Sequence, residues 1–348
     1  MIAPLARHLF ESTLFCLLMG AVASCLRGHR AAARHAIWLV GVSKFALPTA
    51  LLAATGAQIA FMLPASSWIS SLVAGLYAAL VTVLDRVPVK FIPGDAPAVS
   101  AIFLAIWALG SIGMLLRWRA RLIGSCCALR DPADEEQRAL GRTRRRLGLH
   151  TSVQLRISES TSEPTLLRFF HLMIVIPEGL SNRLTAAEFE AVLLHELAHA
   201  VRRDNLIGAF VHGLLCLFWF HPLLWLAEER LIAERERACD EMVIAFGTPR
   251  ETYVNGILKV CRFHLIEPVA GVSGMAGLDL NNRLDLILTC PPRRSLPYGL
   301  RTLLAGMVIA ITFVPIAGGY CAQCVSNGSS TVSQKPGRQV RSPYSRGE

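Results

Sequence analysis

The hydrophobic pattern of the chain is dominated by four long apolar stretches. They cover residues 9–26, 36–62, 98–116 and 302–319. A helix of roughly 17 to 25 residues crosses the hydrocarbon core of a bilayer, and each stretch is long enough for this. Charges inside them are rare, with Glu11 in the first stretch and Lys44 in the second. The pattern predicts four transmembrane helices.

Arginines beside these stretches predict the orientation. Three basic clusters flank them: Arg27, Arg30 and Arg34; Arg117, Arg119 and Arg121; Arg293, Arg294 and Arg301. Short loops rich in Lys and Arg stay in the cytoplasm. We therefore expect residues 1–116 to form a membrane region with three transmembrane helices and an outer loop near 64–97. The fourth helix, 302–319, would lead into a short disordered outer tail, 320–348, although the basic residues of this tail argue against that side.

The composition supports a membrane protein and excludes several other classes. The chain is 53% hydrophobic and 17% charged, whereas about 25% charged residues is usual in soluble domains. Ten cysteines in 348 residues are too few for a disulfide scaffold. The net charge of +10 comes from arginines beside apolar runs, so we expect the lipid bilayer as a partner and no direct nucleic-acid contact. An alternative interpretation of the first stretch is a lipoprotein signal cleaved before Cys25.

The remaining block, 117–301, is long enough for one domain with its own core. An Arg-rich helix near 131–149 precedes two β-like runs, 153–157 and 172–176. Thr185 and Glu188 then have the spacing of a capping box, which predicts a helix running to about residue 201. The next segment, 206–227, is apolar and long enough to cross a membrane. We expect a buried or membrane-embedded hairpin turning near 220–222, because a single crossing would separate the site residues described next.

The helix near 185–201 carries His195-Glu196-Leu197-Ala198-His199, an HExxH pattern. Residues four apart project from the same helical face, so both imidazoles can reach one Zn²⁺ ion. Glu196 is offset from that face and would meet a water molecule on the metal. The motif therefore predicts two zinc ligands, His195 and His199, and a catalytic base, Glu196.

A catalytic zinc site usually has three protein ligands and one open position. A second helix is expected from about 221–222, where proline favours a helix start, to Gly247. Glu236 and Asp240 share one face of it, which suits a carboxylate ligand, Glu236, and an acceptor, Asp240, that orients a ligand histidine. Three alternative ligands lie on the same segment: Glu234, Cys239 and His221.

Taken together, these motifs resemble those of the BlaR/MecR-type integral-membrane zinc metallopeptidases. The resemblance also includes Arg202-Arg203-Asp204 after the HExxH pattern, Arg34-His35-Ala36-Ile37-Trp38 and Ile174-Val175-Ile176-Pro177. It implies an α-helical multi-pass membrane protein with an inserted α+β gluzincin-like domain that holds zinc on His195, His199 and Glu236, with Glu196 catalytic. It further implies a signal transducer of the bacterial inner membrane whose cytoplasmic domain cleaves a transcriptional repressor, often after self-cleavage.

The sequence departs from the β-lactam receptors of this family. Those receptors carry a penicillin-binding sensor with a Ser-x-x-Lys motif after the fourth span. Here the segment 320–348 is short, and no lysine has a serine three positions before it. We therefore expect no covalent β-lactam sensing by this chain. Cys321 and Cys324 form a disulfide or remain thiols, and 290–294 is a linker or a self-cleavage loop; both questions stay open.

The expected reaction is zinc-assisted peptide hydrolysis. Zinc would lower the pKa of its water towards about 7 and polarise the scissile carbonyl, while Glu196 passes a proton from water to the leaving amine. We expect the protein substrate to pair as an added strand with the edge near 172–176. Two other hypotheses are a membrane quality-control protease of the HtpX or CAAX-prenyl-protease type and a non-enzymatic zinc-binding receptor or scaffold. The sequence leaves homo-oligomerisation open.

Overall fold

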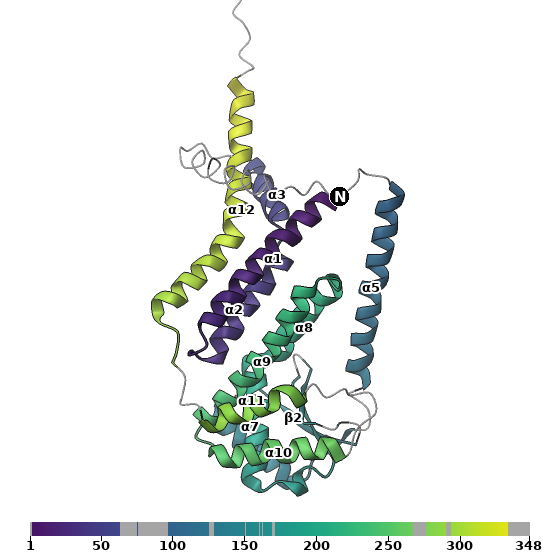
Figure 1. Ribbon diagram of the computed structural model, residues 1–348, viewed down its shortest axis with the longest axis vertical. Helices are drawn as coiled ribbons and strands as arrows, with labels where there is room; N and C mark the ends of the chain where they lie inside the picture. Colours follow the sequence, from purple (N-terminus) through teal and green to yellow (C-terminus); the bar gives the residue numbers. More distant parts are fainter. Residues whose placement is uncertain are drawn as a thin grey trace, which may run out of the picture. The chain divides into compact units, whose positions relative to one another are not determined.

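A computed structural model of the chain is mainly helical (Figure 1). It describes residues 2–62, 75, 97–124, 129–149, 151–159, 161, 163–168, 171–266, 276–289 and 294–332. The chain forms two compact units. The larger unit comprises Ser12–Ser43 and Gly94–Leu300, and the smaller unit comprises Met1–Glu11, Lys44–Pro93 and Arg301–Glu348. Nearly all of the outer loop expected near 64–97 lies outside the described residues.

A small mixed sheet forms one layer of the larger unit. Its strands are β1 (Leu129–Arg130), β2 (Gln154–Ser158), β3 (Thr165–Leu167) and β4 (Met173–Pro177), in the order β1-β2-β4-β3. The parallel strands β2 and β4 agree with the two predicted runs. The expectation that 172–176 forms a sheet edge is wrong, because β3 pairs antiparallel with β4 and all of β4 is buried. A three-residue strand such as β3 is too short to show a hydrophobic period.

Helix α7 (Ala186–Arg202) lies at the centre of the larger unit. It begins with the predicted capping box: Thr185 Oγ1 accepts from the Glu188 N–H at 3.3 Å, and the Glu188 carboxylate accepts from the Thr185 N–H at 2.7 Å. One side of α7 packs on the sheet and on α6 (Asp134–Leu147). The other side packs on α10 (Arg250–Ile266) and α11 (Ala276–Thr289). A helix buried on both sides holds its side chains in fixed positions.

The predicted hairpin is confirmed as α8 (Asp204–Leu217) followed by α9 (Pro222–Ala245). Its tip contacts the apolar helix α5 (Pro97–Gly124). The Trp107 indole donates to the Leu217 carbonyl at 2.8 Å, and the Trp219 indole donates to the Trp107 carbonyl at 3.3 Å. Gly110 permits this approach, because a Cβ at that position would overlap the Trp219 ring. The tip of the hairpin therefore lies against the middle of α5.

Helix α2 (Ala31–Ser43) packs along α9 and is joined to it by a buried ion pair. An Arg34 guanidinium nitrogen lies 2.6 Å from a Glu234 oxygen, and the Arg34 side chain is 4% exposed. Arg34 also donates to the carbonyl of Arg27 at 3.2 Å. The second Glu234 oxygen accepts from Arg237 at 3.2 Å. Glu234 is thus committed to arginines between α2 and α9.

In the smaller unit, the two charges predicted inside apolar stretches face each other. This unit contains the start of α1 (Ile2–Cys25), the short helix η1 (Lys44–Ala46), α3 (Thr49–Met62) and most of α12 (Tyr298–Val332). Glu11 accepts from Arg7 at 3.0 Å and from the Thr49 hydroxyl, and it lies 3.9 Å from Lys44. Mutual pairing is how ionisable groups are accommodated in an apolar environment.

Within the described part of the chain, three helical segments are long and apolar enough to cross a membrane, in agreement with the first, third and fourth predicted spans: Leu5–Cys25, Ala101–Ala120 and Tyr298–Ala322. The second predicted span consists of two helical pieces, Ala31–Ala46 and Leu51–Ile59, which are apolar enough only when taken together. Pro48 lies at the break, because proline lacks the N–H that a continuing helix needs. Helix α12 continues to Val332, so the first part of the expected disordered tail is helical. Cys321 is buried, and the Cys324 side chain lies outside the described residues.

Replacing Arg34 with methionine should destabilise the larger unit by about 3 kcal/mol, because a buried carboxylate loses its charged partner. Unfolding of the purified chain in detergent, followed by tryptophan fluorescence, measures this change. The control is Arg142→Met, which removes an exposed ion pair with Glu190 and should cost under about 1 kcal/mol. Equal losses in the two variants would contradict a structural role for the Arg34 pair.

Candidate metal centre

Helix α7 presents His195 and His199 on one face, one turn apart. Their Nε2 atoms lie 3.2 Å apart. Both rings are largely buried, with 11% and 12% of the side chain exposed. The α7 helix therefore places two imidazole nitrogens close enough together to bind the same metal ion.

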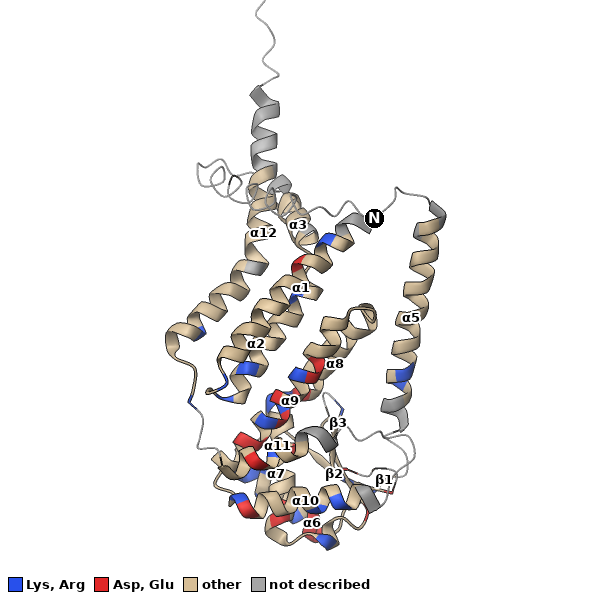
Figure 2. Ribbon diagram, viewed as in Figure 1, with Lys and Arg blue, Asp and Glu red and all other residues tan. Residues whose placement is uncertain are grey.

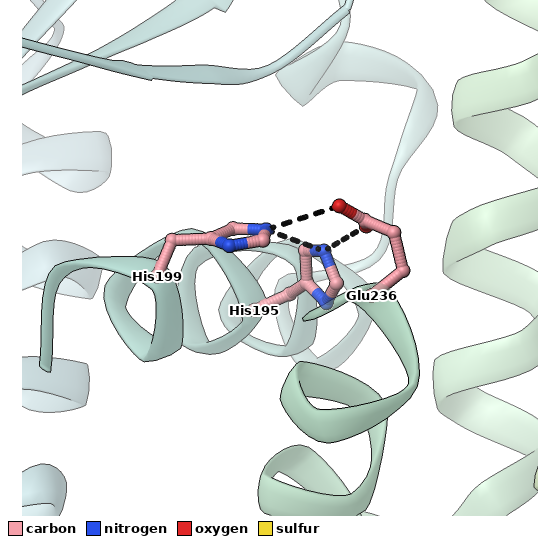
Figure 3. A group of neighbouring side chains, drawn as sticks. All are labelled: His195, His199 and Glu236. Carbon is pink, nitrogen blue, oxygen red and sulfur yellow. Dashed lines mark hydrogen bonds and ion pairs between the residues drawn. The ribbon is translucent and has the colours of Figure 1, made fainter. Parts of the chain in front are cut away.

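Glu236 of α9 extends its carboxylate to the same point (Figure 3). Its oxygens lie 3.4 Å from His195 Nε2 and 3.8 Å from His199 Nε2. Zinc bonds of 2.0–2.1 Å in a tetrahedral arrangement would hold ligand atoms about 3.3 Å apart. The first separation is to Oε2 and the second to Oε1, so two imidazole nitrogens and the Glu236 carboxylate surround a point that suits a single zinc ion.

The other nitrogen of His195 faces a polar network from three further helices. The Tyr253 hydroxyl lies 2.8 Å from His195 Nδ1 and donates to Asp240 at 2.6 Å. Arg283 binds both Asp240 oxygens, at 2.7 and 2.8 Å. In this arrangement His195 Nδ1–H donates to the tyrosine oxygen, so Nε2 is the ring nitrogen that faces Glu236 and His199. Asp240 therefore faces His195 both through Tyr253 and directly, since its Oδ1 atom lies 3.4 Å from His195 Nδ1.

A carboxylate whose role the sequence did not reveal orients the second histidine. His199 Nδ1 donates to Asp204 Oδ2 at 2.8 Å. Arg203 between the two helices has φ 57°, and this left-handed residue turns the chain so that Asp204 begins α8 and faces back to His199. Asp204 was visible in the sequence as part of Arg202-Arg203-Asp204. However, helical spacing predicts only contacts within one helix, and Asp204 lies on the next helix, after a turn.

The charges of the centre shift several pKa values. Burial alone would lower the pKa of His195, but hydrogen bonds with Asp240 and Glu236 raise it to about 9. Burial alone would raise the pKa of Asp240, but Arg283 and His195 lower it to about 2. Burial opposes ionisation of Glu236 too, yet His195 and neighbouring cations hold its pKa well below the usual range. In the metal-free protein both carboxylates are therefore ionised, and a metal that binds His195 displaces a proton.

The alternative ligands make other contacts. Glu234 pairs with Arg34 and Arg237, and His221 Nε2 lies 2.9 Å from Thr13 Oγ1. Cys239 is close to the centre, since its Sγ lies 3.4 Å from His199 Nδ1, and it forms a second group with His199 and Asp204. However, burial raises the pKa of the Cys239 thiol, and a protonated thiol is a poor metal ligand.

Glu196 lies on α7 beside His195 and is 7% exposed. It is not a member of either group of donor atoms found among the described residues. Two other groups were not expected from the sequence: Arg235, which donates to Glu236 at 2.9 Å, and Arg283, which reaches Glu236 at 3.4 Å. Arginine beside acidic residues is common on helices, so nothing in the local sequence distinguished these two.

Comparison with known proteins matches most of the chain. A family model described as BlaR1 peptidase M56 matches residues 7–287, which contain all three donors of the first group. The chain is similar to the regulatory protein BlaR1 of Bacillus licheniformis, with 31% identity over 150 residues that cover 42% of this chain. The matched part spans about a quarter of the length of that curated relative (25%). The resemblance inferred from the motifs is confirmed, and the chain belongs to the BlaR1 peptidase M56 family.

Proposed function

We propose that the chain is an integral-membrane zinc endopeptidase in which His195, His199 and Glu236 hold the ion. The observation that carries the proposal is the convergence of these donor atoms at separations that suit one tetrahedral ion. Family membership supports metallopeptidase chemistry. A purely structural zinc would be enclosed by four protein ligands, whereas this group of described residues has three members.

Glu196 is the proposed general base and acid. When bound, zinc supplies Lewis acidity to the attacking water and the scissile carbonyl. The Glu196 carboxylate accepts a proton from that water and later donates it to the leaving amine. Asp204 and the Tyr253–Asp240 pair keep the Nδ1 protons of the histidines engaged, so that both Nε2 lone pairs stay directed at the ion.

We further propose that the substrate is a cytoplasmic transcriptional repressor and that the chain is a signal transducer of the bacterial inner membrane. Similarity to a relative named as a regulatory protein supports this, and it favours the transducer over the quality-control alternative. The positions of the charges on α5 support a cytoplasmic location for the sheet-bearing part of the larger unit. These charges occur in the last turns of α5, with Arg117 and Arg119, next to the charged sheet-bearing part of the unit (Figure 2).

The substrate backbone is proposed to pair with β3 instead of β4. Strand β3 is an outer strand of the sheet and contacts α7, which carries the histidines. The Asn205 amide donates to the carbonyls of Leu166 and Arg168, both at 3.0 Å, and so holds this strand against the start of α8. An extended peptide added to an outer strand would run beside the metal centre.

The variant Glu196→Gln should retain zinc with unchanged stoichiometry and lose repressor cleavage by at least about a hundredfold, because the amide cannot accept the proton. Cleavage is measured by mass spectrometry of peptides from cells that express the wild type or the variant together with the repressor. Glu190→Gln, on the same helix and paired with Arg142, is the matched control and should remain active. Undiminished cleavage by Glu196→Gln would refute the proposed mechanism.

Removing the carboxylates that orient the histidines should weaken zinc binding. Asp204→Asn and Asp240→Asn should each lower zinc affinity by about 10- to 100-fold, because His199 loses its charged acceptor in the first variant, and Tyr253, which contacts His195, loses the carboxylate that holds it in the second. Competition with a zinc-sensitive dye measures the affinity of the purified chain. Asp285→Asn, an exposed change on α11, is the control. Wild-type affinity in both variants would show that these contacts do not support the metal centre.

A further inference from the structure

A cavity of about 210 Å³ lies in the larger unit where α2, α5, α8 and α9 meet. Its polar lining comes from His35 of α2, Asp204 and His212 of α8, and Glu228 and Arg235 of α9. Trp118 of α5 and apolar side chains of α8 and α9 complete the wall. The three proposed zinc ligands are not part of the lining, so this cavity is distinct from the metal centre.

Asp204 leaves one carboxylate oxygen unpaired beside this cavity. The residue is 1% exposed. Its Oδ2 atom accepts from His199 at 2.8 Å and from Arg202 at 3.1 Å. Its Oδ1 atom is buried and has no hydrogen-bond partner within the described part of the chain. An ionised oxygen without a donor is costly to bury, so Asp204 indicates a donor that enters from the cavity.

The rest of the lining includes further groups that attract a cation. Glu228 provides a second carboxylate, with one oxygen 3.5 Å from His212 Nδ1. The positive charge of Arg235 is already paired with Glu236. The Trp118 ring lies 5.1 Å from the His212 ring, centroid to centroid, and an indole face attracts cations. The lining also contains His35 and His212, and Asp204 pairs with Arg202 through Oδ2. The unpaired Asp204 Oδ1, together with Glu228, the aromatic ring and the apolar walls, suits a small organic cation with N–H donors.

Two contacts connect this cavity to the metal centre. Asp204 orients His199 through its other oxygen, Oδ2. Arg235 lines the cavity and donates to Glu236 at 2.9 and 3.1 Å. A ligand that binds Asp204 would compete with His199 for the charge of the same carboxylate, and binding at two coupled sites is reciprocal.

We propose that this cavity binds a small ammonium or amidinium compound whose N–H groups pair with Asp204 Oδ1, and that its occupancy changes the zinc affinity of the centre through His199. The regulatory half of the inference rests on the proposed zinc site, whereas binding to the cavity does not. Because Trp118 lies within the apolar segment Ala101–Ala120, the cation has two sources: a free amine or the ammonium headgroup of a membrane lipid.

The test uses benzylammonium as the probe and benzyl alcohol as its uncharged counterpart, with the full chain in phosphatidylglycerol nanodiscs. Calorimetry should show one benzylammonium per chain and no binding of benzyl alcohol at the same concentration. Gly208→Leu should abolish binding, because Gly208 lines the cavity and has open space at its Cβ position. Gly213→Leu is the matched control, since Gly213 lies on the same helix, also with open space, outside the lining.

Equal binding of the two probes, or binding that survives in Gly208→Leu, would overturn the cavity assignment. The coupling is tested by zinc titration, in which benzylammonium should change zinc affinity by about fivefold or more in the wild type and not in Gly208→Leu; an unchanged affinity would overturn the regulatory half. The Glu196→Gln variant should bind the probe as the wild type does, so failure of the proposed catalysis is distinguishable from failure of this inference.

Nanodiscs containing phosphatidylethanolamine should weaken probe binding if the lipid headgroup is the natural occupant. They should leave probe binding unchanged if a free amine is the natural occupant.

Discussion

The metal centre depends on one geometric constraint: a carboxylate of α9 must come within a few ångströms of two histidines on α7. The chain meets it by reversing direction twice. A left-handed residue at Arg203 separates α7 from α8, and the turn before Pro222 sends α9 back past α7. If 206–227 crossed the larger unit in one direction, Glu236 would lie far from His195 and His199. The hairpin is therefore a condition for the donor set.

The supporting side chains are held by buried charge pairing and not by apolar packing alone. Asp240 binds Tyr253 and Arg283, and Asp204 binds His199 and Arg202. The ion pair of Arg34 with Glu234 fastens α2 to the same helix that carries Glu236. Helix α9 both contacts α2 and carries Glu236. A shift of the apolar helices that pack on α9 would therefore move Glu236 relative to the two histidines. This arrangement provides a physical route from the apolar helices that pack on α9 to the donors.

Features encoded within one helical turn could be predicted from the sequence. The capping box of Thr185, the two histidines, the start of α9 at Pro222 and the shared face of Glu236 and Asp240 all follow from local spacing. Contacts between segments that are distant in the sequence could not be predicted in this way. Examples are the contacts that Tyr253 and Arg283 make with His195 and Asp240. The β3 strand was missed because three residues show no period. The break at Pro48 was visible in the sequence but was outweighed by the apolar run around it.

X-ray absorption at the zinc edge tests the proposed centre most directly, because it reports the ligand atoms without requiring a substrate. The purified chain with one equivalent of zinc should show only nitrogen and oxygen neighbours at about 2.0–2.1 Å, two of them with the outer-shell scattering of imidazole. A sulfur neighbour at about 2.3 Å would instead assign the metal to the group of His199, Asp204 and Cys239. That result would contradict the proposal that His195, His199 and Glu236 form the centre.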